Sequence, residues 1–366
     1  MYMLFAIESY KFKYPDGSLL FPVQALIVFI EAISTNKLLG CSVFAFTRTK
    51  KFIYLKLMDK KLNLTEIAIL KTMAYYNIFN YPLTADEIRS NIHYKNNGEL
   101  INGSQLDSLI QKGMVFRFDR FYSLNDNYGE VEERVRGNKQ AEKWMKKARY
   151  FSKLISWFPY VRGVSLSGSL SKGYLGEDPD IDYFIITEPG RLWLTRTSLV
   201  LFKRVFLANS HKYFCVNYFI DSQNLELEEK NIFTATELAT LIPVYDEETK
   251  REFFEKNIWV RDFLPNFEIK EMTENVKSKP GLVKKFFEWF FDNGFGNYLD
   301  DYCMKKTTKH WSKKFKKKFS GDDFELTFKS GKEVSKHHPQ NFQKYVLESY
   351  DKKIRELEVQ FGLKLN

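Results

Sequence analysis

Two carboxylates lie in an apolar stretch of this chain, and they restrict its folding more than any other feature of the sequence. Residues 161–187 read VRGVSLSGSLSKGYLGEDPDIDYFIIT, in which an apolar segment runs into Gly-Ser and a loop, and Asp180 and Asp182 open a second apolar segment. Burying an uncompensated charge costs several kcal/mol. At positions i and i+2 of a strand the two side chains leave the same face, where like charges repel. The stretch predicts a strand, a turn and a second strand with a paired acidic site.

A divalent cation would remove this repulsion. Mg²⁺ (or Mn²⁺) binds through one or two carboxylates together with substrate phosphates, and a pair of such ions suits an in-line attack on phosphorus. Gly168 lets a phosphate approach the backbone, and the helix start at Ser169 points N–H groups outward. We expect Asp180 and Asp182 to hold the metal. Gly168, Ser169 and Lys172 would hold the nucleotide, although Lys172 could equally be an exposed loop lysine.

The arrangement resembles the nucleotidyltransferase superfamily typified by DNA polymerase β. That signature is Gly followed by Gly or Ser, a spacer of about ten residues, then Asp, an apolar residue, and Asp or Glu. Here it is Ser167-Gly168-Ser169, ten residues, and Asp180-Ile181-Asp182-Tyr183. The alternative, in which the glycines are only turn residues and the aspartates only cap a strand, leaves the two carboxylates of IDYFII unexplained.

The resemblance implies an α/β (α+β) fold with a mixed-sheet core, and an enzyme that moves a nucleoside monophosphate from a nucleoside triphosphate to an acceptor. The cofactor would be Mg²⁺ or Mn²⁺. The acceptor could be RNA, a protein or a small molecule, because the fold does not choose among them.

Active members of that superfamily use a third carboxylate on a later strand. The candidate strand here, KYFCVNYFID, has Asn217 at that place. Asn can bind a metal through its carbonyl, but it carries no charge and cannot act as a base. Asp221 at the end of the strand is the alternative third ligand, and Glu237 is a weaker one. The sequence thus leaves open a second function, a catalytically weak or inactive nucleotide-sensing regulator.

Before this stretch the pattern is helix, helix, helix, hairpin, which resembles a winged-helix domain. Thr65 is a candidate cap of the first helix, and Thr84 with Glu87 forms a capping box before the second. The third helix, SQLDSLIQK, carries one basic and one acidic residue, a poor surface for phosphates. The domain could contact DNA or a protein. A wider resemblance, in YYNIFNYPLTADEI, GRLWLTR and NIFTATELATLIPVY, is to bacterial proteins that join a winged helix to a nucleotidyltransferase domain.

These patterns divide the 366 residues into four parts. We expect an unassigned N-terminal appendage (1–57), a winged-helix-like domain (58–129), a nucleotidyltransferase core (130–265) and a helical, basic C-terminal domain (266–366). The net charge of +10 favours a polyanionic partner. The run KHWSKKFKKKF could bind a nucleic-acid backbone, or it could be a solvated helix that packs Trp311 and its neighbours inward.

The remaining composition indicates a cytoplasmic protein without a membrane anchor. Three cysteines lie far apart and follow no metal-binding spacing, as expected for reduced thiols. The apolar run from Leu19 to Ile33 is interrupted by polar residues and is shorter than the ~20 residues of a membrane span.

Overall fold

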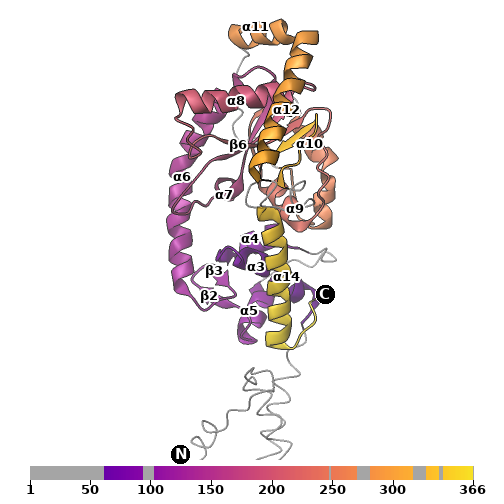
Figure 1. Cartoon of the computed structure of the whole chain (residues 1–366). Helices are drawn as coiled ribbons and strands as arrows, with labels where there is room; N and C mark the ends of the chain where they lie inside the picture. Colours follow the sequence, from indigo (N-terminus) through magenta and orange to yellow (C-terminus); the bar gives the residue numbers. More distant parts are fainter. Residues whose placement is uncertain are drawn as a thin grey trace, which may run out of the picture. The chain divides into compact units, whose positions relative to one another are not determined.

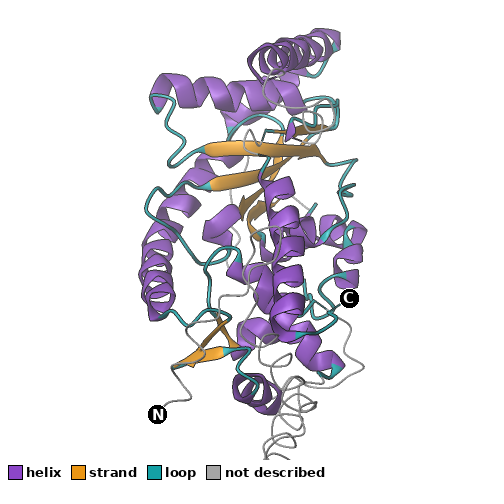
Figure 2. Cartoon of the chain, turned by 60° about the horizontal axis from the view of Figure 1, so that its bottom comes forward, coloured by secondary structure: helices purple, strands orange, loops and turns teal. Residues whose placement is uncertain are grey.

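The computed structural model describes residues 62–93, 103–246, 249–269, 281–315, 327–337 and 341–365 (Figure 1). The expected appendage, 1–57, lies outside them. The described residues belong to one compact unit with a mixed α+β fold, in which helices surround a three-stranded and a five-stranded sheet (Figure 2). Among the helices described, none has the length and hydrophobicity that a transmembrane span requires.

The first part, here called the helix–hairpin unit (62–124), has the expected three helices and hairpin, and in addition a short strand, β1, that the pattern does not predict. It contains α3 (Leu64–Asn77), β1 (Leu83–Thr84), α4 (Ala85–Ser90), α5 (Gly103–Gln111), β2 (Phe116–Phe118) and β3 (Phe121–Ser123). Strand β3 pairs antiparallel with both β1 and β2. The capping box of Thr84 and Glu87 is confirmed. Helix α3 begins earlier than predicted, because Asn63 and Glu66 form its capping box instead of Thr65. Each such cap contributes about 1 kcal/mol.

The five-stranded sheet has the order β7-β4-β5-β6-β8 among the described residues. Its strands are β4 (Val161–Ser167), β5 (Asp182–Thr187), β6 (Cys215–Asp221), β7 (Ile242–Asp246) and β8 (Val334–Lys336). Strands β5 and β6 are parallel, and the other neighbours are antiparallel. A parallel pair needs a crossover connection, which α8 (Leu192–Phe206) supplies. The short α7 (Gly168–Ser171) joins β4 to the loop before β5.

Both faces of this sheet are covered. Because side chains alternate along a strand, Tyr183 and Ile185 of β5 pack in one cluster, which includes residues of α6 (Tyr128–Ser156), α8 and α12 (Gly294–Phe315). Phe184 and Ile186 pack in a second cluster, with residues of α9 (Ile232–Thr240), α10 (Lys250–Lys256) and the 3-10 helix η1 (Ile258–Asp262). Each large apolar side chain buried in this way contributes about 1.5–3 kcal/mol. The start of β5, which carries Asp182 and follows Asp180 by two residues, is therefore held between two packed layers.

The described residues after 265 belong to the same compact unit as the rest of the described chain and not to a separate domain, in contrast to the expected boundary. They contain α11 (Leu282–Phe291), α12, β8 and α14 (Phe342–Phe361). Strand β8 extends the five-stranded sheet beside β6, and Trp311 of α12 is buried in the core of that sheet. Helix α14 instead completes the core of the helix–hairpin unit with Val346, Ile354 and Leu357.

Candidate functional site

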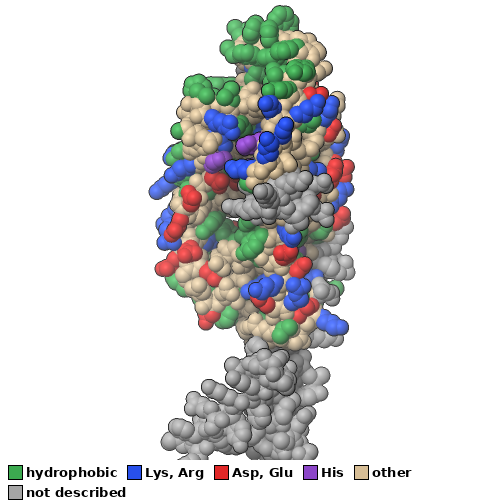
Figure 3. All heavy atoms as spheres, in the orientation of Figure 1, with side chains coloured by type: hydrophobic (Ala, Val, Ile, Leu, Met, Phe, Trp, Pro, Cys, Tyr) green, Lys and Arg blue, Asp and Glu red, His purple; other side chains and the backbone are tan. Residues whose placement is uncertain are grey.

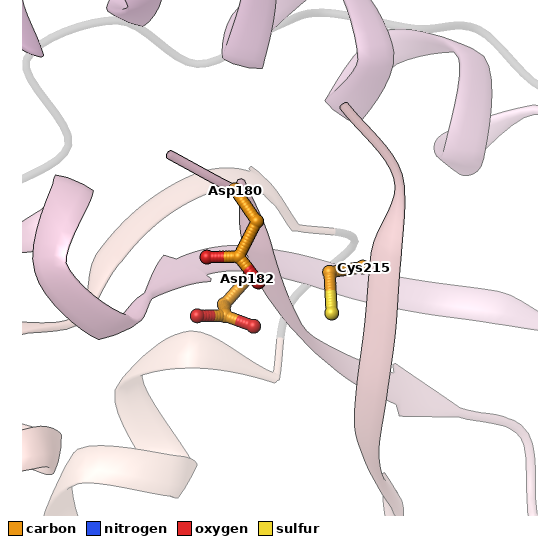
Figure 4. A group of neighbouring side chains, drawn as sticks. All are labelled: Asp180, Asp182 and Cys215. Atoms are coloured by element: carbon orange, nitrogen blue, oxygen red, sulfur yellow. The ribbon is translucent and has the colours of Figure 1, made fainter. Parts of the chain in front are cut away.

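The structure brings the two predicted aspartates together at the beginning of β5 (Figure 4). Asp182 lies opposite Ser167, the last residue of β4, and opposite Cys215, the first residue of β6. One carboxylate oxygen of Asp180, one of Asp182 and the Sγ of Cys215 lie within 4.8 Å of one another. No pattern in the sequence indicates Cys215 as a neighbour of the pair, because only the parallel register of β5 and β6 brings it there.

Gly168 lies directly against the Asp182 carboxylate. Its φ of +68° is in the left-handed region, which side chains other than glycine rarely adopt. A Cβ at this position would overlap with Oδ2 of Asp182. Glycine is therefore needed at 168 for two reasons, the backbone conformation and the space that the carboxylate occupies. Ser169, which follows, is exposed at the surface.

The two carboxylates share one electrostatic environment. Burial, and then the charge of Asp180, raise the pKa of Asp182 to about 7. Burial also raises the pKa of Asp180. The neighbouring thiol of Cys215 lowers the pKa values of both carboxylates, while burial and the two carboxylates raise the pKa of the thiol. Near neutral pH the pair therefore tends to keep a proton, and Cys215 is a neutral thiol. A bound cation would favour the ionised carboxylates.

The amide of Asn217 lies beside Asp182, at the place where the resemblance implies a third carboxylate. Its Nδ2 donates to Oδ1 of Asp182 at 2.9 Å. Its Oδ1 is buried and has no hydrogen-bond partner among the described residues. A shift in the pairing of β5 with β6 skips Asn217, since Val216 pairs with Tyr183 and Tyr218 with Phe184, and such bulges redirect a side chain. A buried acceptor without a donor costs about 1–3 kcal/mol, and it is a potential metal ligand.

The expectation that Asp221 is the third metal ligand is wrong. Asp221 lies opposite Thr187 at the far end of β6, whereas Cys215 lies opposite Asp182. At about 3.3 Å per residue, this strand separates Asp221 from the acidic pair by roughly 20 Å. Its Oδ1 accepts from the backbone N–H groups of Gln223 and Asn224, so its role is to close the turn after β6.

Lys172 lies beside the site, but its ammonium group is already paired. Its Nζ contacts Glu237 of α9 at 2.7 Å and donates to the backbone oxygen of Gly168 at 3.1 Å. Both side chains are half-buried. The negative charge of Glu237 raises the pKa of Asp182, and the positive charge of Lys172 lowers the pKa of Asp182. Glu237, which the sequence ranked below Asp221, is thus a third carboxylate within electrostatic range of Asp182.

The loop between α7 and β5 is fixed from the side of α6. Asn138 donates to the backbone oxygen of Gly173 at 2.5 Å, and the N–H of Leu175 donates to the oxygen of Gly137 at 3.2 Å. A Cβ at Gly137 would overlap with the ring of Tyr174. Gly137 therefore lowers the helix propensity of α6 by about 1 kcal/mol relative to alanine, and it lets the loop lie close to the helix.

Comparisons with protein-family models, with curated proteins and with solved structures find no match to this chain. Its function is consequently inferred from the residues and the geometry of the site.

Proposed function

We propose that this chain is a nucleotidyltransferase that moves a nucleoside monophosphate from a nucleoside triphosphate to an acceptor, with Mg²⁺ or Mn²⁺ as cofactor. The observation that carries the proposal is the position of the acidic pair. Asp180 and Asp182 meet at one end of a mixed sheet, where Asp182 lies against Gly168 of the turn that precedes them in the sequence. Two carboxylates with raised pKa values beside a glycine turn suit a metal that also binds phosphate.

The donor atoms fit a hard cation. The carboxylates of Asp180 and Asp182 and the unpartnered Oδ1 of Asn217 are oxygen ligands, which Mg²⁺ and Mn²⁺ prefer. Cys215 would be a soft ligand, but its raised pKa keeps it protonated, so it would serve as a hydrogen-bond donor. When bound, the metal would neutralise the carboxylates and stabilise the charge that develops on the triphosphate.

The side chains of the chain itself would position the substrates. Lys172 would exchange its contact with Glu237 for the triphosphate, since both partners of that ion pair are half-buried and reachable. Gly168 and Ser169 would offer backbone N–H groups to the phosphates. Asn217 cannot accept a proton, whereas Glu237, released by Lys172, could take the proton of the acceptor hydroxyl.

The finer description of the fold belongs to the same proposal. The element order of the helix–hairpin unit is that of a winged helix, in which α5 would be the recognition helix. The five-stranded mixed sheet, with its acidic pair at the start of β5, would be the nucleotidyltransferase core.

A second candidate function is supported by Asn217. With an amide in place of the third carboxylate, the site could bind a nucleotide without turning it over, and the chain would be a nucleotide-sensing regulator. DNA binding by α5 has little support. Its outward positions include Ser104, Asp107 and Gln111, and the adjacent Lys112 is paired with Glu66 at 2.7 Å. A protein partner suits this face, on which Asp107 adds a negative charge, better than a phosphate backbone.

The deciding experiment is incubation with each nucleoside triphosphate labelled at the α-phosphate, with Mg²⁺ or Mn²⁺ and total cell extract. We expect label to enter RNA, protein or a small molecule, which identifies the acceptor class, and to disappear with Asp180→Ala. Asp178→Ala, which changes an exposed carboxylate of the same loop, is the matched control. Nucleotide binding without any transfer would favour the sensor, and neither binding nor transfer would reject both functions.

A further inference from the structure

Helix α11 has its amphipathic pattern inverted. Three of its residues, spaced at i, i+4 and i+7, face the protein. These are Lys284, Glu288 and Phe291, and two of the three are charged. The other apolar residues of the helix are exposed. Packing normally places the apolar side of a helix against the core, so the position of α11 calls for a different explanation.

Polar contacts hold α11 in this orientation. The Nζ of Lys284, whose residue is only 2% exposed, donates to the backbone oxygen of Val161 at 2.8 Å and to that of Ser156 at 3.3 Å. The carboxylate of Glu288 accepts from the N–H of Tyr160 at 2.6 Å and pairs with Arg162 at 2.8 Å. These contacts fix which side of the helix faces outward.

The outward side consists of two further stripes at the same spacing. One is Leu282, Phe286 and Trp289, exposed by 87%, 56% and 74%. The other is Val283, Phe287 and Phe290, exposed by 69%, 41% and 47%. The first turns of α12 add three exposed aromatic residues, Phe295, Tyr298 and Tyr302. We call these nine residues the α11 surface, and Figure 3 shows hydrophobic side chains gathered at this end of the described chain.

The area of the α11 surface is large for a monomer. At these exposures, side chains of this size present on the order of 1,000 Å² to solvent. The largest apolar patch of a typical monomer measures about 300–600 Å². A stable protein interface buries about 800 Å² on each partner and is enriched in Phe, Trp and Tyr. Both the area and the composition of the α11 surface match such an interface.

A lipid surface is the main competing occupant, and the charges disfavour it. Helices that bind lipid surfaces carry a polar face rich in Lys and Arg. In α11 the side chains of Lys284 and Glu288 are turned inward. In α11 and at its C-cap, the charged residues left at the border of the surface are Lys285 and Asp292, which are opposite in sign. The side chain of Asp292 is 83% exposed, although it lies 3.8 Å from Arg191. On α12, Lys306 lies over the ring of Tyr302.

We propose that the α11 surface is the interface of a homodimer. In a two-fold interface both copies use the same patch. If residue i of the first copy contacts residue j of the second, then residue j of the first copy contacts residue i of the second. If two α11 helices pair antiparallel about a point between Glu288 and Trp289, Lys285 of one copy lies opposite Asp292 of the second copy. In this register Trp289 of one copy lies beside Trp289 and Phe286 of the second copy, whereas Leu282 lies farther from the two-fold axis. The opposite charges at the border thus fit a self-complementary pairing, and this inference is independent of the proposed function.

The test is sedimentation equilibrium of the full chain, wild type against Trp289→Glu, with circular dichroism to verify folding. We expect a dimer for the wild type and a dissociation constant at least about thirtyfold weaker for the variant, as for a central hot-spot residue. Phe206→Glu is the matched control, because Phe206 is an exposed phenylalanine (70%) on α8, and it should leave the dimer unchanged. Lys285→Asp and Asp292→Lys should each weaken the dimer, and the double variant should restore it.

The opposite results are equally clear. A wild type that is monomeric at every concentration tested overturns the proposal. So does a dimer that survives Trp289→Glu. A monomer that binds vesicles of anionic lipid through Trp289 would replace the second copy by a lipid surface.

Discussion

The carboxylate of Asp182 fills the space that a side chain at position 168 would need. This contact joins the two halves of the sequence motif, the Gly-Ser turn and the Asp-x-Asp strand start, which the antiparallel pairing of Ser167 with Asp182 brings together. The glycine is required by its φ of +68° and by its neighbour across the strands. Substitution at 168 consequently acts on the acidic pair itself.

Gly168→Ala should abolish metal-dependent nucleotide binding. The new Cβ would displace the Asp182 carboxylate, and the left-handed backbone would add about 1–2 kcal/mol of strain. Gly173→Ala is the control, because Gly173 has a φ of +72° but no heavy atom lies within 4 Å of the point that its Cβ would occupy. Both variants should be destabilised by a similar strain, while calorimetric titration with nucleotide and Mg²⁺ should show lost binding for Gly168→Ala alone. Equal binding by the two variants would contradict the assignment.

The metal-free chain should become less stable as the pH rises from about 4 to 7. The folded state holds a proton on Asp182 up to a pKa of about 7, well above the ordinary value of an aspartate. Folding is therefore favoured while the group is protonated, and this contribution is lost as the pH passes through 7. Burial raises the pKa of Asp300 to about 6, which acts in the same direction.

Asp182→Asn tests this dependence, because it removes the Asp182 contribution and leaves that of Asp300. By denaturant unfolding in chelator, the variant should lose less stability than the wild type between pH 5 and pH 8, by about 1 to 4 kcal/mol. Asp178→Asn, a change at an exposed carboxylate, should behave as the wild type. A variant that is no more stable than the wild type at the higher pH would count against the raised pKa.

Lys172→Met should weaken nucleotide binding about tenfold or more, the value of a hydrogen bond between charged groups. Glu237→Gln should have the opposite effect, because Lys172 no longer has to leave its 2.7 Å ion pair. A half-buried pair of this kind contributes about 1 kcal/mol, or about fivefold in affinity. The measurement is titration with a non-hydrolysable triphosphate. Lys146→Met, at an exposed lysine of α6, is the control. If Lys146→Met weakens triphosphate binding as much as Lys172→Met does, Lys172 has no special role in the site.

Asn217→Asp should make folding depend on the metal. The substitution replaces the amide that donates to Asp182 at 2.9 Å with another negative charge. Without metal we expect a loss of about 1–3 kcal/mol. With Mg²⁺ the added carboxylate becomes a ligand, so the thermal midpoint should rise more steeply with Mg²⁺ concentration than in the wild type. The result that would count against the site is a variant whose midpoint does not respond to Mg²⁺.

Much of the architecture could be predicted because it depends on local signals. The Thr84 capping box, the long helix before Pro159 and the two apolar strands of the acidic stretch are visible in neighbouring residues. Strands β7 and β8 were not predicted. Pro243 lies within β7, where only an edge strand tolerates proline, and β8 is too short to show a period.

The residues of the site also divide into those that local sequence signals predict and those that depend on the pairing of distant strands. Gly168, Asp180 and Asp182 lie together because a short turn and strand pairing connect them. The positions of Cys215 and Asn217 depend on the parallel register and the bulge of β6, which no local pattern contains. The sequence alone places Asp221 on the same strand as Asn217, but the length of β6 separates Asp221 from the acidic pair, at the opposite end of the strand.

Helix α14 has a consequence for biosynthesis. Its residues Val346, Ile354 and Leu357 complete the core around α3, although the whole segment from Asn77 to Phe342 is translated between the two helices. Helix α3 therefore leaves the ribosome with part of its apolar side uncovered, and it stays so until α14 has been translated. Chaperones would have to protect this nascent intermediate, and a chain truncated before Phe342 would be a target for proteolysis around α3.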